Sequence, residues 1–98
     1  MATSQTSPLI SAAQSRAARA WLNISQQQLA DRCLVNRKTV AEFEREASVP
    51  YERTLRDIQR TLEELGVAFV FEGTRGAGVV DRRILGEGRL VTTALSSV

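Results

Sequence analysis

Residues 26–45, QQQLADRCLVNRKTVAEFER, decide how this chain folds. Apolar residues recur at helical spacing on both sides of a break at residues 34–36. Ser25 and Gln28 form a capping-box pattern at the start, and Asn36 is a good N-cap for a second helix. The side chains expected to fill the space between the two helices are Leu29, Val35, Val40 and Phe43. The stretch therefore predicts two short helices that cross closely, with the small Ala30 at the crossing.

One further helix is predicted on each side of this pair. Ser11 and Gln14 form a capping box at the start of the first helix, and Asn23 can adopt the left-handed conformation that ends it. We expect one apolar stripe of this helix to face the core: Ala13, Ala17, Ala20 and Trp21. The last helix spans roughly residues 52–65 and ends at Gly66. Its apolar positions are Leu55, Ile58, Leu62 and Leu65.

The periodicity changes after the last helix. Residues 67–71, VAFVF, are β-branched and aromatic and predict a strand. The glycine-rich residues 73–78 predict a turn or short loop, after which residues 79–83 can return as a second strand. We expect four segments: a disordered lead (1–9), a four-helix domain (10–65), a β arm (66–83) and a weakly ordered tail (84–98), in which residues 89–91 can form a short strand.

Composition narrows the classes of function. The chain has 98 residues, no histidine, one cysteine and a formal net charge of +2. Without histidine, Ser/His/Asp and Cys/His catalysis are excluded, and one cysteine cannot form a zinc or iron–sulfur site alone. No apolar run is long enough for a membrane helix, no signal peptide opens the sequence, and nothing favours secretion. We therefore expect a cytoplasmic protein that is not an enzyme and holds no metal or cofactor.

Charge is unevenly distributed along the chain. Residues 10–41 contain five basic side chains and one carboxylate, whereas residues 42–65 contain seven carboxylates and four arginines. Such a domain can present its basic end to a polyanion. A mixed, solvated surface is the alternative, and charge alone does not decide between them.

At this point the sequence resembles a known family, the XRE-type (lambda-repressor/Cro-like) helix-turn-helix regulators. The resemblance covers about residues 10–65. It is carried by Arg16, Arg19, Ser25, Gln26, Leu29, Ala30, Thr39, Val40, Phe43, Glu44, Pro50, Thr54, Leu55 and Ile58. Three positions where the family usually has glycine differ: Asn23, Leu34 and Glu46. Leu34 implies a turn with altered φ or strain, and we expect its side chain to pack beside Val35 in the core.

The resemblance implies a mostly α fold, with four helices and a C-terminal β-hairpin or strand arm like that of a subset of small bacterial members. It also implies that the third helix enters the DNA major groove. The candidate DNA-binding residues are Arg16, Arg19, Gln26, Asn36, Arg37, Lys38, Thr39 and Glu42. Arg37 and Lys38 would donate to guanine, and Glu42 would accept from cytosine.

Several of these residues also have structural interpretations. Glu42 can instead pair within its helix, Gln26 can simply begin a helix, and Asn36 is first of all a cap. Arg16 and Arg19 reach flanking phosphates or are solvated, and Glu44 matches a family position that is usually structural. Cys33 is expected to be a small buried hydrophobe, with a redox sensor as the alternative.

The strand at residues 67–71 is apolar on both faces, and one small domain covers only one of them. We therefore expect a homodimer, bacterial or phage-encoded, on a palindromic operator. The expected dimer interface is Leu62, Leu65, Val67, Phe69, Val70 and Phe71. The rival interpretation is a helix-turn-helix protein-interaction module, an antiactivator or antitoxin, whose β arm binds another protein.

Overall fold

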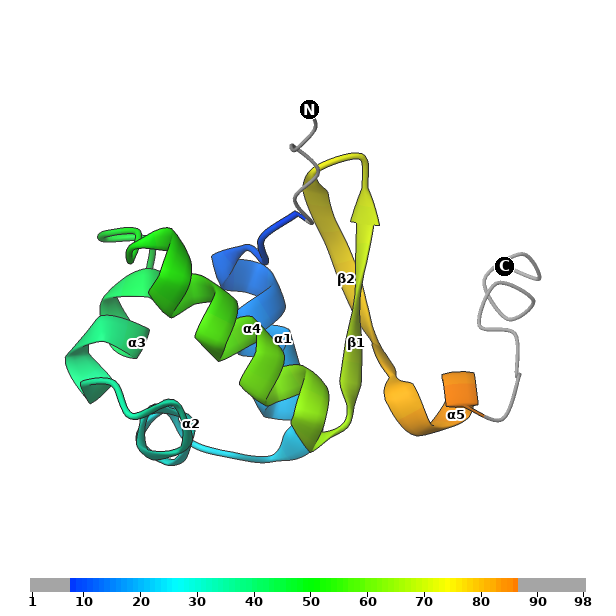
Figure 1. The fold of residues 1–98 in the computed structure, drawn as a ribbon, viewed down its shortest axis with the longest axis horizontal. Helices are drawn as coiled ribbons and strands as arrows, with labels where there is room; N and C mark the ends of the chain where they lie inside the picture. Colours follow the sequence, from blue (N-terminus) through cyan, green and yellow to red (C-terminus); the bar gives the residue numbers. More distant parts are fainter. Residues whose placement is uncertain (1–7, 87–98) are drawn as a thin grey trace.

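The computed structural model describes residues 8–86, which form a helical bundle with a β-hairpin at one end (Figure 1). The elements are α1 (Ala12–Leu22), α2 (Gln26–Cys33), α3 (Arg37–Glu44), α4 (Glu52–Leu65), β1 (Val67–Glu72), β2 (Arg75–Asp81) and α5 (Arg82–Gly86). In Figure 1, α4 runs across the front of the bundle and leads directly into β1, while α3 lies at the end far from the hairpin. The predicted fold class is confirmed.

The helix starts form as the sequence predicts. The Ser11 and Ser25 hydroxyl oxygens accept hydrogen bonds from the backbone N–H groups of Gln14 (3.1 Å) and Gln28 (3.0 Å), and both capping boxes are complete. The Asn36 side chain accepts from the Lys38 backbone N–H at 3.0 Å. These bonds satisfy N–H groups that have no partner within the helix, so α1, α2 and α3 begin at defined residues.

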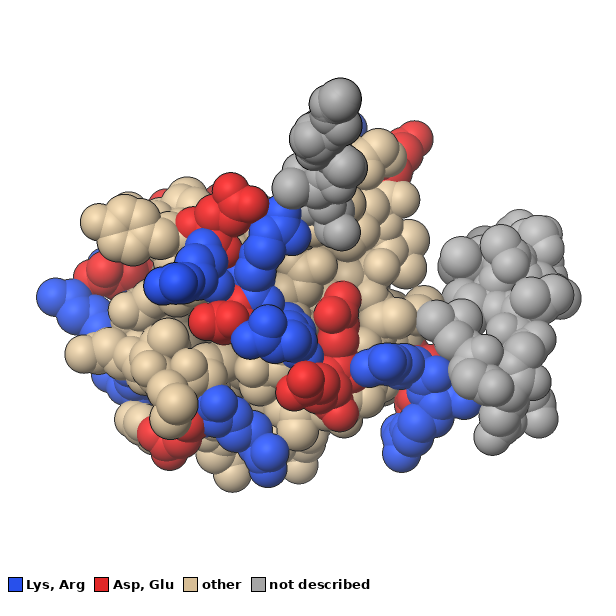
Figure 2. Space-filling view, viewed as in Figure 1, with Lys and Arg blue, Asp and Glu red and all other residues tan. Residues whose placement is uncertain are grey.

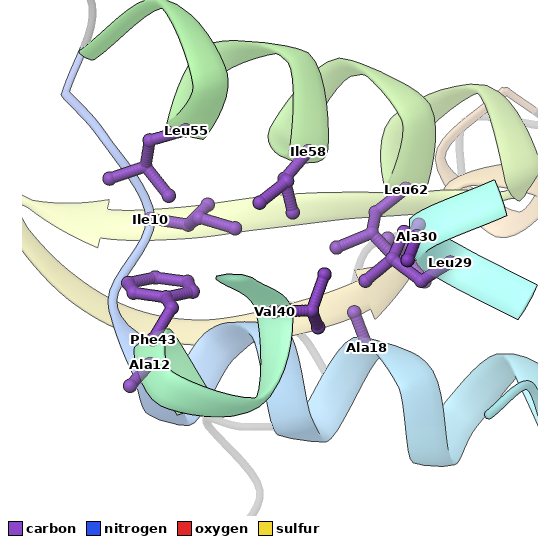
Figure 3. Close-up of a cluster of buried hydrophobic side chains, with 11 residues drawn as sticks. Ile10, Ala12, Ala18, Leu29, Ala30, Val40, Phe43, Leu55, Ile58 and Leu62 are labelled. Atoms are coloured by element: carbon purple, nitrogen blue, oxygen red, sulfur yellow. The ribbon is translucent and has the colours of Figure 1, made fainter. Parts of the chain in front are cut away.

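The core lies between α4 and the other three helices of the bundle (Figure 3). In Figure 3, Leu55, Ile58 and Leu62 point from α4 toward α3 and α1. The buried apolar residues are Ile10, Ala12, Ala18, Leu29, Ala30, Val40, Phe43, Leu55, Ile58, Leu62 and Val67. Each large aliphatic side chain buried here contributes about 1.5–3 kcal/mol. Of the predicted inner faces of α2, α3 and α4, Leu29, Ala30, Val40, Phe43, Leu55, Ile58 and Leu62 are buried, whereas Cys33 and Leu65 are only half-buried.

The predicted inner face of α1 is wrong. Ala13, Ala17, Ala20 and Trp21 are all exposed, Trp21 to 59%. The buried residues of this helix are Ala12, Gln14, Ser15 and Ala18. The helix is rotated because Gln14 and Ser15 have hydrogen-bonding partners inside the protein, and those partners lie on elements far along the chain.

The hairpin is longer than predicted. Only residues 73–74 form the turn, and β2 already begins at Arg75, so the predicted loop at residues 73–78 is wrong. Gly76 is a strand residue that lies against the side chains of α1: a Cβ atom there would overlap the Gln14 Oε1 atom. A glycine that sequence reasoning assigned to a loop is needed instead for close packing of backbone against a helix.

The end of the predicted arm and the expected N-terminal lead also differ from expectation. β2 ends at Asp81, because the Asp81 carboxylate accepts from the Arg83 backbone N–H at 2.9 Å and the chain turns into α5. Leu9, placed in the expected lead, packs against the core. The remainder of that lead before Pro8, and the short strand expected at 89–91, fall outside the described residues.

β1 and β2 pair antiparallel, with Val67 opposite Asp81, Val70 opposite Gly78, and a bulge after Val70. Val67 is fully buried, and Phe69 and Phe71 are partly buried against the core. The alternate residues Ala68 and Val70 form the outer face, where Val70 is 41% exposed. The expectation that one face of the strand lies against the helices is confirmed.

Candidate nucleic-acid interface

The turn between α2 and α3 fixes how α3 projects from the domain. Leu34 ends α2 in the left-handed conformation (φ 60°, ψ 40°), and the next residue, Val35, donates its N–H to the Ala30 carbonyl at 3.0 Å. The Leu34 side chain is 91% exposed, so the expectation that it packs in the core is wrong. Val35 provides the apolar contact there instead.

The other two departures from the usual glycines adopt the same conformation. Asn23 has φ 58° and Glu46 has φ 64°. The chain therefore keeps the backbone geometry for which glycine is best suited while using side chains that tolerate it less well, Leu34 and Glu46 above all.

The outer face of α3 gathers most of the predicted contact residues. Arg37 and Lys38 follow the Asn36 cap directly and are exposed, whereas Thr39 and Glu42 are half-buried. The Lys38 ammonium lies 3.9 Å from the Glu42 carboxylate, one helical turn away. The intrahelical pair predicted as the alternative role of Glu42 is therefore present.

Beneath this face, Glu44 is a buried hub that joins three helices. Its carboxylate accepts from the Ser15 hydroxyl of α1 (2.6 Å), from Nε (2.9 and 3.0 Å) and Nη2 (2.6 Å) of Arg19, also on α1, and from Nε2 of Gln26 on α2 (3.1 Å). Glu44 is only 2% exposed. Its predicted structural role is confirmed.

The environment of Glu44 favours the charged carboxylate. Burial by itself raises the pKa of Glu44, but the hydrogen bonds from Arg19, Ser15 and Gln26 outweigh it, and the pKa is lowered. A single ionised carboxylate thus holds α1, α2 and α3 in fixed relative positions.

Sequence reasoning missed this network. Glu44 follows Val40 by four residues and therefore falls on the buried face of α3, where a carboxylate requires a cationic partner. That spacing is the signal from which a search for Arg19 could have started.

The two arginines of α1 have different surroundings. The Arg19 side chain is 20% exposed, and besides Glu44 it donates from Nη1 to the Ile24 carbonyl at 3.1 Å. The Arg16 side chain is 47% exposed; it donates to the Glu44 carbonyl and lies 3.8 Å from the Glu46 carboxylate. Arg16 therefore reaches solvent near α3, whereas Arg19 is part of the buried Glu44 network that joins α3 to α1 and α2.

A surface hollow of about 440 Å³ runs beside α3. Thr39 and Glu42 form one wall, and residues 48–51 form the other. Val49 and Tyr51 on that wall are 78% and 88% exposed. Sequence reasoning did not single out this loop, which projects next to the predicted contact residues.

On the face formed by α4, in contrast, cationic and anionic side chains alternate (Figure 2). Arg56 lies 3.1 Å from Glu52, and Arg60 lies 2.7 Å from Asp57, each pair within one turn of the helix. Charges that neutralise one another in this way do not attract a polyanion strongly, so the exposed cations beside α3 are the better candidates.

Comparison with known protein families agrees with this geometry. Residues 16–67, just over half of the chain, match the model of the helix-turn-helix family. The search of curated proteins found no match. In the described part of the chain, the helices are too short or too polar to cross a membrane. The chain belongs to the XRE-type helix-turn-helix family, whose members are DNA-binding transcription regulators.

Proposed function

We propose that this protein is a sequence-specific regulator of transcription that binds double-stranded DNA as a homodimer on a palindromic operator. One observation carries the proposal: the capped N-terminus of α3 presents Arg37 and Lys38 to solvent on a helix whose position is fixed by the buried Glu44. Repression by covering a promoter in the bacterial cytoplasm is the minimal mechanism, since it requires no second domain.

Seven of the eight candidate DNA-binding residues have a direct contact role in this proposal. Arg37 and Lys38 donate to guanine O6 and N7, and Glu42 accepts from a cytosine amino group when DNA displaces Lys38 from it. Arg16, Asn36 and Thr39 contact the phosphate backbone. Gln26 uses one amide hydrogen on Glu44 and offers the other to a phosphate.

Arg19 has a different role. Its guanidinium is engaged with Glu44 and Ile24, so it positions the helices rather than contacting DNA directly. The hydrogen bonds between Arg19 and Glu44 support a rigid position for α3, whose outer face carries Arg37 and Lys38.

A homodimer supplies the second reading helix. One helix makes too few base contacts for useful specificity, whereas two helices about 34 Å apart read two half-sites. We assign the dimer contact to the β arm, with Leu65, Phe69, Val70 and Phe71 partly accessible. Leu62 and Val67 are fully buried within the protomer, so they support the arm from below.

The test is selection of duplexes from a random pool, followed by mobility shifts. We expect a palindromic site bound with an affinity that falls steeply with salt. Arg37→Ala should cost about 1–3 kcal/mol and relax one base position in each half-site. Arg75→Ala removes the same charge from the start of β2, at the end of the molecule far from α3, and is the matched control, with little effect on specificity. Absence of any duplex binding at low salt would refute the proposal.

One observation favours the rival function: the hairpin presents an apolar outer face around Val70, which suits contact with another protein. In a protein-interaction module, Arg37→Ala leaves function in the cell intact, whereas Val70→Lys abolishes it. In a DNA-binding regulator that needs its dimer, both changes impair operator binding.

A further inference from the structure

The two edges of the hairpin differ in how they are protected against pairing with another strand. β2 has a bulge, Gly76 and Gly78, and a charged residue at each end, Arg75 and Asp81. Bulges, glycines and charges are the devices that keep edge strands from pairing. β1, VAFVFE, has none of them before its last residue, Glu72.

The backbone of β1 presents hydrogen-bonding groups at its outer edge. The Gly66 carbonyl accepts from the Arg82 N–H at 2.8 Å, so alternation along the register turns the N–H and C=O groups of Ala68 and Val70 toward β2. The corresponding groups of Phe69 and Phe71 then point to the outer edge, whereas Val67 is fully buried and its backbone groups are not accessible to a second strand. Among the described residues, β2 is the one strand paired with β1.

A groove accompanies this edge. One hollow, of about 440 Å³, lies between Phe71 and the α4 side chains of Gln59 and Arg60. A second hollow, of about 240 Å³, lies beside Val67 and Ala68, and Glu63 lines both. The space next to β1 is therefore bordered by Phe71, Val67 and Ala68 on the strand and by polar side chains of α4, and it follows the edge to which another strand can add.

We infer that this edge docks β1 of a second copy of the chain, antiparallel and with Val70 on the two-fold axis. The strand is complementary to itself in this register. Phe69 faces the partner's Phe71 and Phe71 faces the partner's Phe69, which gives two aromatic cross-strand pairs over the α4 groove. Glu72 faces the partner's Ala68, beside which the second hollow is lined by one cation, Arg82, and one carboxylate, Glu63.

This inference rests on the proposed dimeric regulator and specifies its interface. It predicts one continuous sheet across the dimer, with Val70 at a position where the two strands are not hydrogen-bonded to each other. Residues opposed at such a position have Cα atoms about 4.5 Å apart, within the range that a disulfide spans.

Cysteine cross-linking tests the register. In a Cys33→Ala background, Val70→Cys should give an almost complete disulfide-linked dimer under mild oxidation. Gly78→Cys is the matched control, because it lies directly opposite Val70 across the hairpin and has open space around its Cβ position; it should stay uncross-linked. Ala68→Cys and Glu72→Cys should cross-link with each other when mixed and not separately.

The other outcomes distinguish failure of the interface from failure of the proposed function. A monomer in light scattering at micromolar concentration would overturn the inference, because no second copy then docks at this edge. A dimer that cross-links through Gly78→Cys, or through neither position, would place the interface elsewhere while leaving the proposed function standing. Cross-linking at Val70→Cys without DNA binding would refute the proposed function and leave the interface standing.

Discussion

The two ends of the molecule are held in place by different forces. At the α3 end, the ionised Glu44 joins Arg19, Ser15 and Gln26 across three helices. At the hairpin end, the neutral Gln14 amide donates to the Val70 and Gly78 carbonyls at 2.8 and 3.0 Å. The outer face of α3, with Arg37 and Lys38, is therefore held in position by a buried charge. The hairpin is held against α1 by neutral hydrogen bonds and close packing. Substitutions at the two ends should therefore differ in how much they lower the free energy of unfolding and in how that loss depends on pH.

The largest effect should come from Glu44→Ala. It leaves the mostly buried Arg19 guanidinium without its carboxylate and Ser15 without its acceptor, and should lower the free energy of unfolding by about 3–5 kcal/mol. Urea denaturation measures this loss.

The matched control is Glu52→Ala, which removes an exposed glutamate paired with an arginine, Arg56, one turn away on α4. The free energy of unfolding should change by no more than about 0.5 kcal/mol. Equal losses in both variants would mean that burial does not strengthen the Glu44 network, and the contrast between the two ends would fail.

Acid should weaken the same network without any mutation. The pKa of Glu44 is lowered in the folded protein, so its contribution to stability is complete above the unfolded value of 4.5 and is lost as pH falls through the lowered folded value. Urea denaturation of the wild type and of Glu44→Gln should show a difference that shrinks from pH 7 to pH 3. A constant difference over this range would contradict a titrating Glu44.

A smaller loss is expected at the hairpin end from Gly76→Ala. The new methyl group would displace the Gln14 amide, with a cost of about 1–3 kcal/mol for hydrogen bonds left unmade. Gly78→Ala, with no atom within 4 Å of the added carbon, should change stability by no more than about 0.5 kcal/mol. Thermal unfolding compares the two variants, and equal midpoints would show that Gly76 is not needed for packing.

The smallest effect should be a gain. Leu34→Gly relieves a left-handed leucine and exposes nothing new, because the side chain is already 91% exposed. Stability should rise by up to about 1 kcal/mol, since the strain relieved is partly offset by the added freedom of glycine in the unfolded chain. Asn23→Gly should gain less, because asparagine tolerates this conformation. A loss of several kcal/mol in a urea titration of Leu34→Gly would show that its side chain packs.

Local patterns predicted the bounds of α1 to α4 well, whereas α5 falls where a strand end and a weakly ordered tail were predicted. Both capping boxes, the Asn36 cap and the bounds of α4 follow from residues within one or two turns of each other, and the structure has them where the sequence placed them. The exposure of Arg37 and Lys38 follows from the same local rule, because residues after an N-cap on the outer face project from the helix.

Features that depend on distant partners were not predictable in this way. Ser15 and Gln14 are polar, and their burial is understandable only once Glu44 and the hairpin carbonyls are in place. Gly76 is suited equally to a loop or to a strand packed against a helix, and only the approach of Gln14 distinguishes them. The inward face of α1 and the length of the hairpin were therefore beyond local sequence patterns.

The exposed position of Trp21 has a practical consequence. It is the chain's one tryptophan and lies at the C-terminal end of α1, where its indole is close enough to the Asp81 carboxylate of β2 to help lower the pKa of that group. The Arg83 guanidinium lowers the pKa of Asp81 to about 2, with a smaller contribution from Trp21, so this carboxylate stays charged beside the indole at neutral pH. Intrinsic fluorescence therefore reports separation of the hairpin from α1, while far-ultraviolet circular dichroism follows the helices. The two optical signals distinguish release of the arm from melting of the domain.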